Sequence, residues 1–226
     1  MSTKRKVFFT LSLLGLFATP ALADDKSDCS SRRNSAGLAA CDRLIASGKF
    51  QGERLAKIYH HRAVFWRSIG GDLDKAIADD TEAIRLSPRF AVAFSSRGLS
   101  LWQKGDFDRA LADGNAAIAL DPNDGKAYNR RGLAFRSKGD RYRAIKDFDE
   151  AIRRLPGIAA FHNSRGNALR DVGLTLKAEA DFTKAIALDP HHISAYALTV
   201  EAGTPLAADP ARHPDDDVQA DEYQLA

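Results

Sequence analysis

The stretch NRRGLAFRSKGDRYRAIKDFDEAIRRLP, residues 129–156, decides the fold because its pattern recurs along the chain. The prolines that end the pattern stand 34 residues apart, at Pro88, Pro122, Pro156 and Pro190. Small residues keep the same step, at Gly98, Gly132 and Gly166 and at Ala83, Ala117, Ala151 and Ala185. Several residue types that share one register predict a chain built from repeated units.

One unit has the pattern of a helical hairpin. Apolar residues at helical spacing between Ala127 and Phe135 predict a first helix, which ends at Gly139 because glycine accepts a left-handed conformation. Asp140 can cap a second helix, and the residue before Pro156 cannot continue it. A hairpin of this size cannot bury both its faces, so the units are expected to stack on one another.

The order glycine, aromatic, alanine, aromatic, alanine and proline within this period resembles the tetratricopeptide repeat (TPR) family. The resemblance covers about residues 55–192 and implies an all-α, right-handed superhelical solenoid of helix-turn-helix repeats. Arginine stands where the family usually has leucine, before the first-helix glycine. Gly114 and Asp80 stand where later repeats have Phe148 and Phe182. We expect the second repeat to pack less tightly, since glycine in a helix costs ~1 kcal/mol relative to alanine.

The segments outside the repeats differ in composition. Residues 1–23 have a basic start, an apolar run and a small-x-small ending at Ala23, which predicts a signal peptide and export, with the bacterial periplasm as the expected compartment. An uncleaved membrane anchor is the alternative, although the apolar run is shorter than the ~20 residues that span a bilayer. The remaining units are expected to be a polar leader (24–34), a half-repeat or cap (35–52), four repeats (53–192), a capping helix (193–203) and a disordered acidic tail (204–226).

The charge is unevenly distributed. The full chain carries +3, and loss of residues 1–23 removes three basic residues and leaves a net charge of 0. Residues 204–226 contain six acidic residues and one basic residue, a net of −5, so residues 24–203 carry +5. A neutral, exported chain is a poor candidate for nucleic-acid binding. The acidic tail can fold back along a basic groove as a weak internal competitor.

Two patterns have structural explanations beside functional ones. Cys29 and Cys41 predict a disulfide in an exported protein, with a redox or metal pair as the alternative. Arginines of the first helices and aspartates of the second helices recur in register and predict repeated ion pairs, with ligand-binding arginines as the alternative. These residues are Arg62, Arg97, Arg131 and Arg165, and Asp79, Asp113, Asp147 and Asp181.

The resemblance implies a concave face lined by the first helices, where such modules bind peptides. Arginine, lysine and asparagine at these positions predict a groove for an acidic or carboxylate-bearing peptide, and tryptophan adds an apolar contact. The predicted peptide-binding residues are Arg67, Trp102, Lys126, Asn129, Arg130, Arg136, Asn163, Asn167 and Arg170. Solvated helix faces are the alternative explanation. The lysine–asparagine–arginine clamp of some chaperone-binding TPR domains is not fully reproduced.

Catalytic motifs are missing from the sequence. No glycine-rich phosphate loop, zinc-ligand spacing or nucleophile elbow occurs, and the pairs His60-His61 and His191-His192 are expected on the surface. We therefore predict no catalytic residues, metal or cofactor. The predicted function is a non-catalytic scaffold for a protein or peptide partner. A chaperone-like adaptor that holds exported clients is the alternative, and an enzyme is a distant third. The sequence names neither the partner nor the oligomeric state.

Overall fold

The computed structural model describes residues 22–31, 34–69 and 71–189. Within these residues the chain forms ten helices and no strand, which confirms the all-α prediction. The helices are α1 (Leu22–Ser31), α2 (Ser35–Ala46), α3 (Gly52–Ile69), α4 (Leu73–Leu86), α5 (Ala91–Gln103), α6 (Phe107–Leu120), α7 (Gly125–Ser137), α8 (Arg141–Arg154), α9 (Ala159–Asp171) and α10 (Thr175–Leu188). The predicted signal peptide up to residue 21, the capping helix and the acidic tail lie outside the described residues.

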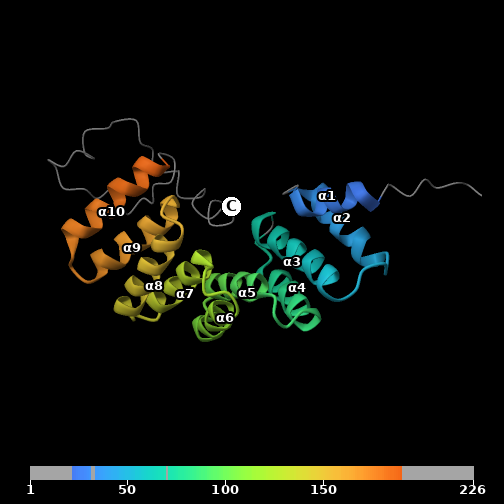
Figure 1. The fold of residues 1–226 in the computed structure, drawn as a ribbon, viewed down its shortest axis with the longest axis horizontal. Helices are drawn as coiled ribbons and strands as arrows, with labels where there is room; N and C mark the ends of the chain where they lie inside the picture. Colours follow the sequence, from blue (N-terminus) through green and yellow to red (C-terminus); the bar gives the residue numbers. More distant parts are fainter. Residues whose placement is uncertain (1–21, 32–33, 70, 190–226) are drawn as a thin grey trace, which may run out of the picture.

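The helices pair into hairpins that follow one another along an arc (Figure 1). We call α3, α5, α7 and α9 the A helices, and α4, α6, α8 and α10 the B helices. Each A helix packs on its own B helix, each B helix packs on the next A helix, and successive A helices also contact one another. Contacts between neighbours produce the solenoid that the repeat pattern predicts.

Two local features form the turn that connects an A helix to its B helix. Gly71, Gly105, Gly139 and Gly173 all have a positive φ, between 61° and 84°, which residues with a Cβ rarely adopt. In the first three hairpins an aspartate follows and caps the B helix; Asp140 Oδ1, for example, accepts a hydrogen bond of 3.0 Å from the Arg143 amide. The fourth hairpin has Leu174 at this position and no side-chain cap.

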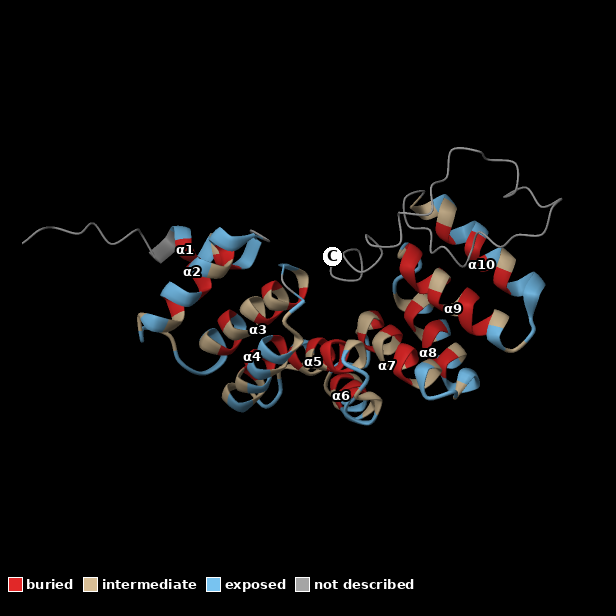
Figure 2. Ribbon diagram, turned by 180° about the vertical axis from the view of Figure 1, so that it is seen from behind, coloured by how far each residue is buried: buried red, intermediate tan, exposed pale blue. Residues whose placement is uncertain are grey.

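The buried residues lie where the helices meet (Figure 2). In the third hairpin the Phe148 ring fills the space beside Gly132, where an added Cβ would lie 2.7 Å from the ring. Phe182 and Gly166 repeat this arrangement, with 2.6 Å for the equivalent contact. Small glycines on the A helices thus admit phenylalanine from the B helices.

The second hairpin, which lacks this phenylalanine, fills the space in another way. The side chain of Arg131 lies over Gly114, and a Cβ added there would be 2.8 Å from the Arg131 Cβ. The methylenes of a long arginine can cover apolar surface while the guanidinium stays polar. Arg131 therefore covers Gly114, whereas the atoms nearest to a Cβ added at Gly98 belong to Asp113, Ala110 and Gly114 of the second hairpin's own B helix.

The predicted arginine–aspartate pairs are confirmed in all four hairpins. Arg131 donates from Nε and Nη2 to both Asp147 oxygens, at 2.8 and 2.7 Å. The equivalent bidentate pairs are Arg62–Asp79, Arg97–Asp113 and Arg165–Asp181. Desolvation raises the pKa of Asp147, and hydrogen bonds from Arg131 oppose that shift. The same bonds raise the pKa of Arg131, so its guanidinium stays charged.

Each of these arginines also reaches the preceding hairpin through Nη1. Arg131 donates to Asn115 at 2.9 Å, and Arg165 donates to Asp149 at 2.8 Å. The same contact joins Arg62 to Asp42 on α2, at 2.7 Å. Helix α2 therefore occupies the place of a B helix before the first full repeat.

The predicted disulfide joins Cys29 on α1 to Cys41 on α2. Both cysteines are buried with Leu44, Ile58 and Phe65 in one apolar cluster. The segment described as a polar leader in the sequence is mostly helical, since α1 reaches Ser31. Among the described residues, no helix combines the length and the apolar character that a membrane crossing requires.

Candidate functional site

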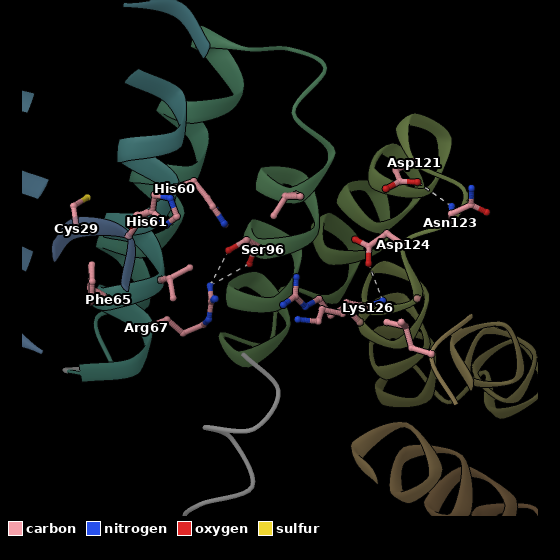
Figure 3. A pocket seen from close by; sticks show the side chains of 16 residues that line it. Cys29, His60, His61, Phe65, Arg67, Ser96, Asp121, Asn123, Asp124 and Lys126 are labelled. Atoms are coloured by element: carbon pink, nitrogen blue, oxygen red, sulfur yellow. Dashed lines mark hydrogen bonds between the residues drawn. The ribbon is translucent and has the colours of Figure 1, made fainter. Parts of the chain in front are cut away.

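The concave side holds a cavity of about 480 Å³ at the N-terminal half of the arc. Its walls come from α1, from the A helices α3, α5 and α7, and from the turn that leads into α7 (Figure 3). Three of the nine predicted peptide-binding residues line it: Arg67, Lys126 and Arg130. The structure thus brings part of the predicted set together, and places the other six outside this cavity.

Arg67 crosses from α3 to the neighbouring A helix. Its Nη1 donates to the Ser96 hydroxyl at 3.0 Å (Figure 3) and to the Ser100 hydroxyl at 3.1 Å. Trp102 and Arg136 stand in the same register and reach the following A helix in the same way. Trp102 donates to the Ser137 hydroxyl at 2.8 Å, and Arg136 donates to Asp171 at 2.7 Å. These positions join successive repeats, a structural use that the sequence did not predict.

The asparagines lie deeper than the sequence suggests. Asn129 and Asn167 are buried because the neighbouring hairpins cover the sides of the A helices. Asn167 accepts a hydrogen bond of 2.8 Å from Arg170, whose guanidinium also lies over the Phe182 ring. Asn163 is half-buried. Asn129 and Asn167 are therefore not open to a groove in the described chain, and their side chains belong to the packing between repeats.

Arg130 is a second arginine of the cavity wall, on α7. Its Nη1 donates to the Ser95 hydroxyl at 2.8 Å, and burial lowers the pKa of its guanidinium. No carboxylate of the described residues lies within ion-pair distance of Arg130, in contrast to the arginines that pair with aspartates along the solenoid. A partly desolvated guanidinium without a carboxylate favours the arrival of an anionic group.

Two carboxylates also border the cavity, at the turn before α7. Asp121 accepts a hydrogen bond from the Asn123 amide at 3.0 Å, and Asp124 accepts one from the Lys126 amide at 2.8 Å. Asp124 is the N-cap of α7. Because both carboxylates already satisfy backbone amides of their own turn, they fix the start of α7 and place Lys126 and Arg130 along the cavity.

The two adjacent histidines of α3 are not both surface residues, contrary to the expectation. His60 Nδ1 lies 2.8 Å from Asp80 Oδ1, and Asp80 is fully buried at the position that phenylalanine holds in later repeats. His61 lines the cavity, and burial, followed by the neighbouring charges of His60 and Lys57, lowers its pKa to about 4. Near neutral pH, His61 therefore offers a neutral imidazole to the cavity.

Other lining residues were not predicted as binding residues, although a signal for two of them existed. Ser96 stands 34 residues before Arg130, which is one repeat. His61 stands 35 residues before Ser96, because the first repeat is one residue longer than the others. Val92 and Leu155 also line the cavity, and both are exposed apolar residues. The described residues contain no group of three or more histidines, cysteines, aspartates or glutamates that is placed to hold a metal ion.

Comparisons with solved structures give the same fold. The structure titled "Crystal structure of MamA" superimposes with a TM-score of 0.59 at 20% identity, covering 76% of this chain and 96% of that chain. "MamA 41-end from Desulfovibrio magneticus RS-1" superimposes with a TM-score of 0.60 at 20% identity, covering 76% and 97%. At this identity the likeness concerns the fold alone. A comparison with curated protein sequences found no significant match.

The family comparison agrees with the repeat register and with the hairpins. The model described as "Tetratricopeptide repeat" matches residues 70–125 and 129–193, together more than half of the chain. Both matched ranges fall on the stacked A and B helices. The chain therefore belongs to the tetratricopeptide repeat family.

Proposed function

We propose that this protein is a non-catalytic interaction scaffold that binds an acidic peptide segment of a partner in its concave cavity. Membership of a family of protein-interaction modules supports the scaffold. The observation that carries the acidic preference is Arg130, a partly desolvated guanidinium whose hydrogen-bond partner among the described residues is a hydroxyl. An incoming carboxylate would form the charge-assisted bonds that the other repeats already make internally.

The rest of the cavity suits a peptide chain. Lys126 adds a second positive charge, and Val92 and Leu155 offer apolar contacts beside the basic residues. His61 adds a neutral imidazole that can bind the peptide backbone. A ligand with acidic residues next to apolar ones therefore fits better than a uniformly charged one.

We also propose that the protein works outside the cytoplasm, in the periplasm of a bacterium. The basic, apolar and small-residue order of residues 1–23 supports export. The Cys29–Cys41 disulfide is consistent with an oxidising compartment.

The test is a selection of peptides on the full mature chain, followed by titration of the selected peptides. Peptides rich in aspartate or glutamate should be enriched, and Arg130→Gln should weaken their binding by about tenfold, the effect of losing ~1.4 kcal/mol. Arg153→Gln is the matched control, because Arg153 is exposed on α8 and pairs locally with Glu150. Enrichment of neutral peptides, or equal binding by both variants, would contradict the acidic preference.

The same protein preparation distinguishes the proposed scaffold from the alternative, a chaperone-like adaptor. A scaffold should bind its peptide with a fixed stoichiometry and leave the aggregation of unrelated unfolded proteins unchanged. An adaptor that holds exported clients should suppress that aggregation at substoichiometric to equimolar amounts, with little preference for acidic peptides.

A further inference from the structure

The chain itself contains a segment that matches the chemistry of the cavity. Five of the eight residues from Asp215 to Glu222 are acidic, and none is basic. Val218 lies within this segment, and Tyr223 and Leu225 follow it. The cavity offers the complementary set, with Arg130 and Lys126 beside Val92 and Leu155.

We propose that residues 215–222 of this chain dock in the concave cavity and compete there with acidic partner peptides. The inference rests on the proposed function in one respect, since both ligands would use the same basic residues. The inference adds regulation of partner binding, because a partner would have to displace the protein's own acidic segment from the cavity.

The length of the connecting chain permits this contact. The described chain ends at Asp189, directly after α10, and 25 residues (190–214) separate it from Asp215. A stretch of 25 residues spans at most about 80–90 Å when fully extended. The cavity walls on α3, α5 and α7 lie one to three A-helix steps from α9, on which α10 packs, and packed helices are about 10 Å apart. The segment therefore reaches the cavity without unfolding α10.

The expected strength of the contact suits a regulator. Exposed charge pairs are weak and are screened by salt, so the segment alone should bind poorly. Attachment to the same chain, however, supplies an effective concentration on the order of millimolar. A segment that binds only at about this concentration as a free peptide would occupy the cavity for about half of the time when tethered. It would then weaken the binding of a partner without preventing it.

Zero-length carbodiimide cross-linking of the full mature chain tests the docking directly. In the monomeric fraction at low salt, Lys126 should form an amide with a carboxylate of residues 215–222, as identified by mass spectrometry. Lys146, which is exposed on α8, is the internal control. Cross-linking to Lys126 should fall in 0.5 M salt, and in Arg130→Gln. Equal cross-linking to Lys126 and Lys146, or none to Lys126, would overturn the proposal.

Competition is measured with a labelled peptide of residues 211–226 and two full chains. In one chain Asp215, Asp216, Asp217 and Asp221 are changed to asparagine and Glu222 to glutamine. This chain should bind the peptide about twofold more tightly than the parent, because its own segment no longer occupies the cavity for about half of the time. Equal affinities would overturn the proposal. If peptides of other acidic sequences fail to bind either chain while the Lys126 cross-link forms, the docking stands and the proposed function fails.

Discussion

At the residue scale, the close approach of A and B helices depends on two glycines that face phenylalanine rings. A Cβ at Gly132 would lie 2.7 Å from Phe148, whereas a Cβ at Gly98 would lie 3.3 Å from the Asp113 Cβ. We expect Gly132→Ala to lower the free energy of unfolding by about 2 kcal/mol through overpacking. Gly98→Ala should be close to neutral, because the gain of ~1 kcal/mol in helix propensity offsets the tighter contact. Urea unfolding followed by circular dichroism compares the two, and equal losses would show that ring packing does not decide the effect.

The pKa of His61 gives the protein a predictable response to acid. Its folded-state pKa of about 4 lies below the value of 6.5 that is usual for a histidine in an unfolded chain, so the folded protein binds this proton less well than the unfolded chain. The resulting stability is complete above the unfolded value and is lost as the pH falls towards 4. After allowance for partial exposure, we expect about 1–2 kcal/mol from this group. Between pH 7.5 and pH 4.5, His61→Gln should therefore lose less stability than the parent in urea titrations. Parallel losses would assign the acid response to other groups.

At the element scale, α1 depends on its disulfide more than on an apolar face. Its sequence has no continuous apolar stripe, and its described contacts with α2 include Cys29 and the ion pair of Asp25 with Arg43. Replacing both cysteines by serine should lower the free energy of unfolding by about 3 kcal/mol, the effect of a cross-link that closes a short loop. Hydrogen exchange in α1 should then become fast while α7 stays protected. Asp25→Asn is the control and should leave α1 docked; an α1 that stays protected without the disulfide would contradict this account.

The arginine–aspartate pairs hold the hairpins in one orientation, and a double-mutant cycle separates this role from simple stabilisation. Asp147→Leu leaves the Arg131 guanidinium desolvated and should cost about 3 kcal/mol. Arg131→Met should also destabilise the fold, because Asn115 and Asp147 both lose a donor. The double variant should be more stable than the sum of the two losses predicts, since it leaves no buried charge unpaired. Additive losses in urea unfolding would show that the two side chains act independently.

At the scale of the whole molecule, the sequence predicted the repeats but only part of the candidate site. The turns and the ion pairs are local or strictly periodic, so positions such as Gly139, Asp140 and Arg131 revealed them. Contacts between neighbouring A helices depend instead on residues that change from repeat to repeat. Arg67 and Arg136 share a register, yet one binds serine hydroxyls and the other an aspartate of the next repeat. The register shows which residues are equivalent, but the partner of each depends on how two hairpins pack.

The same contacts between A helices determine which part of the solenoid unfolds most easily. Each hairpin touches its neighbours, so stability should be distributed along the chain as a sum of hairpin and interface terms. The Arg136–Asp171 pair is one such interface contact, and it joins the third hairpin to the fourth. Its loss should therefore affect the C-terminal end of the described chain far more than the N-terminal end.

Native-state hydrogen exchange tests this expectation with Arg136→Ala. A partly exposed ion pair contributes up to about 1 kcal/mol, so exchange in α9 and α10 should accelerate by up to about fivefold, while α3 and α4 stay unchanged. Arg109→Ala is the matched control, because Arg109 pairs with Asp106 inside its own hairpin and should change no interface. Equal acceleration in all helices would mean that the solenoid opens as a single cooperative unit. Acceleration confined to α9 and α10 would show that this contact between A helices holds the fourth hairpin on the third, as the nearest-neighbour account requires.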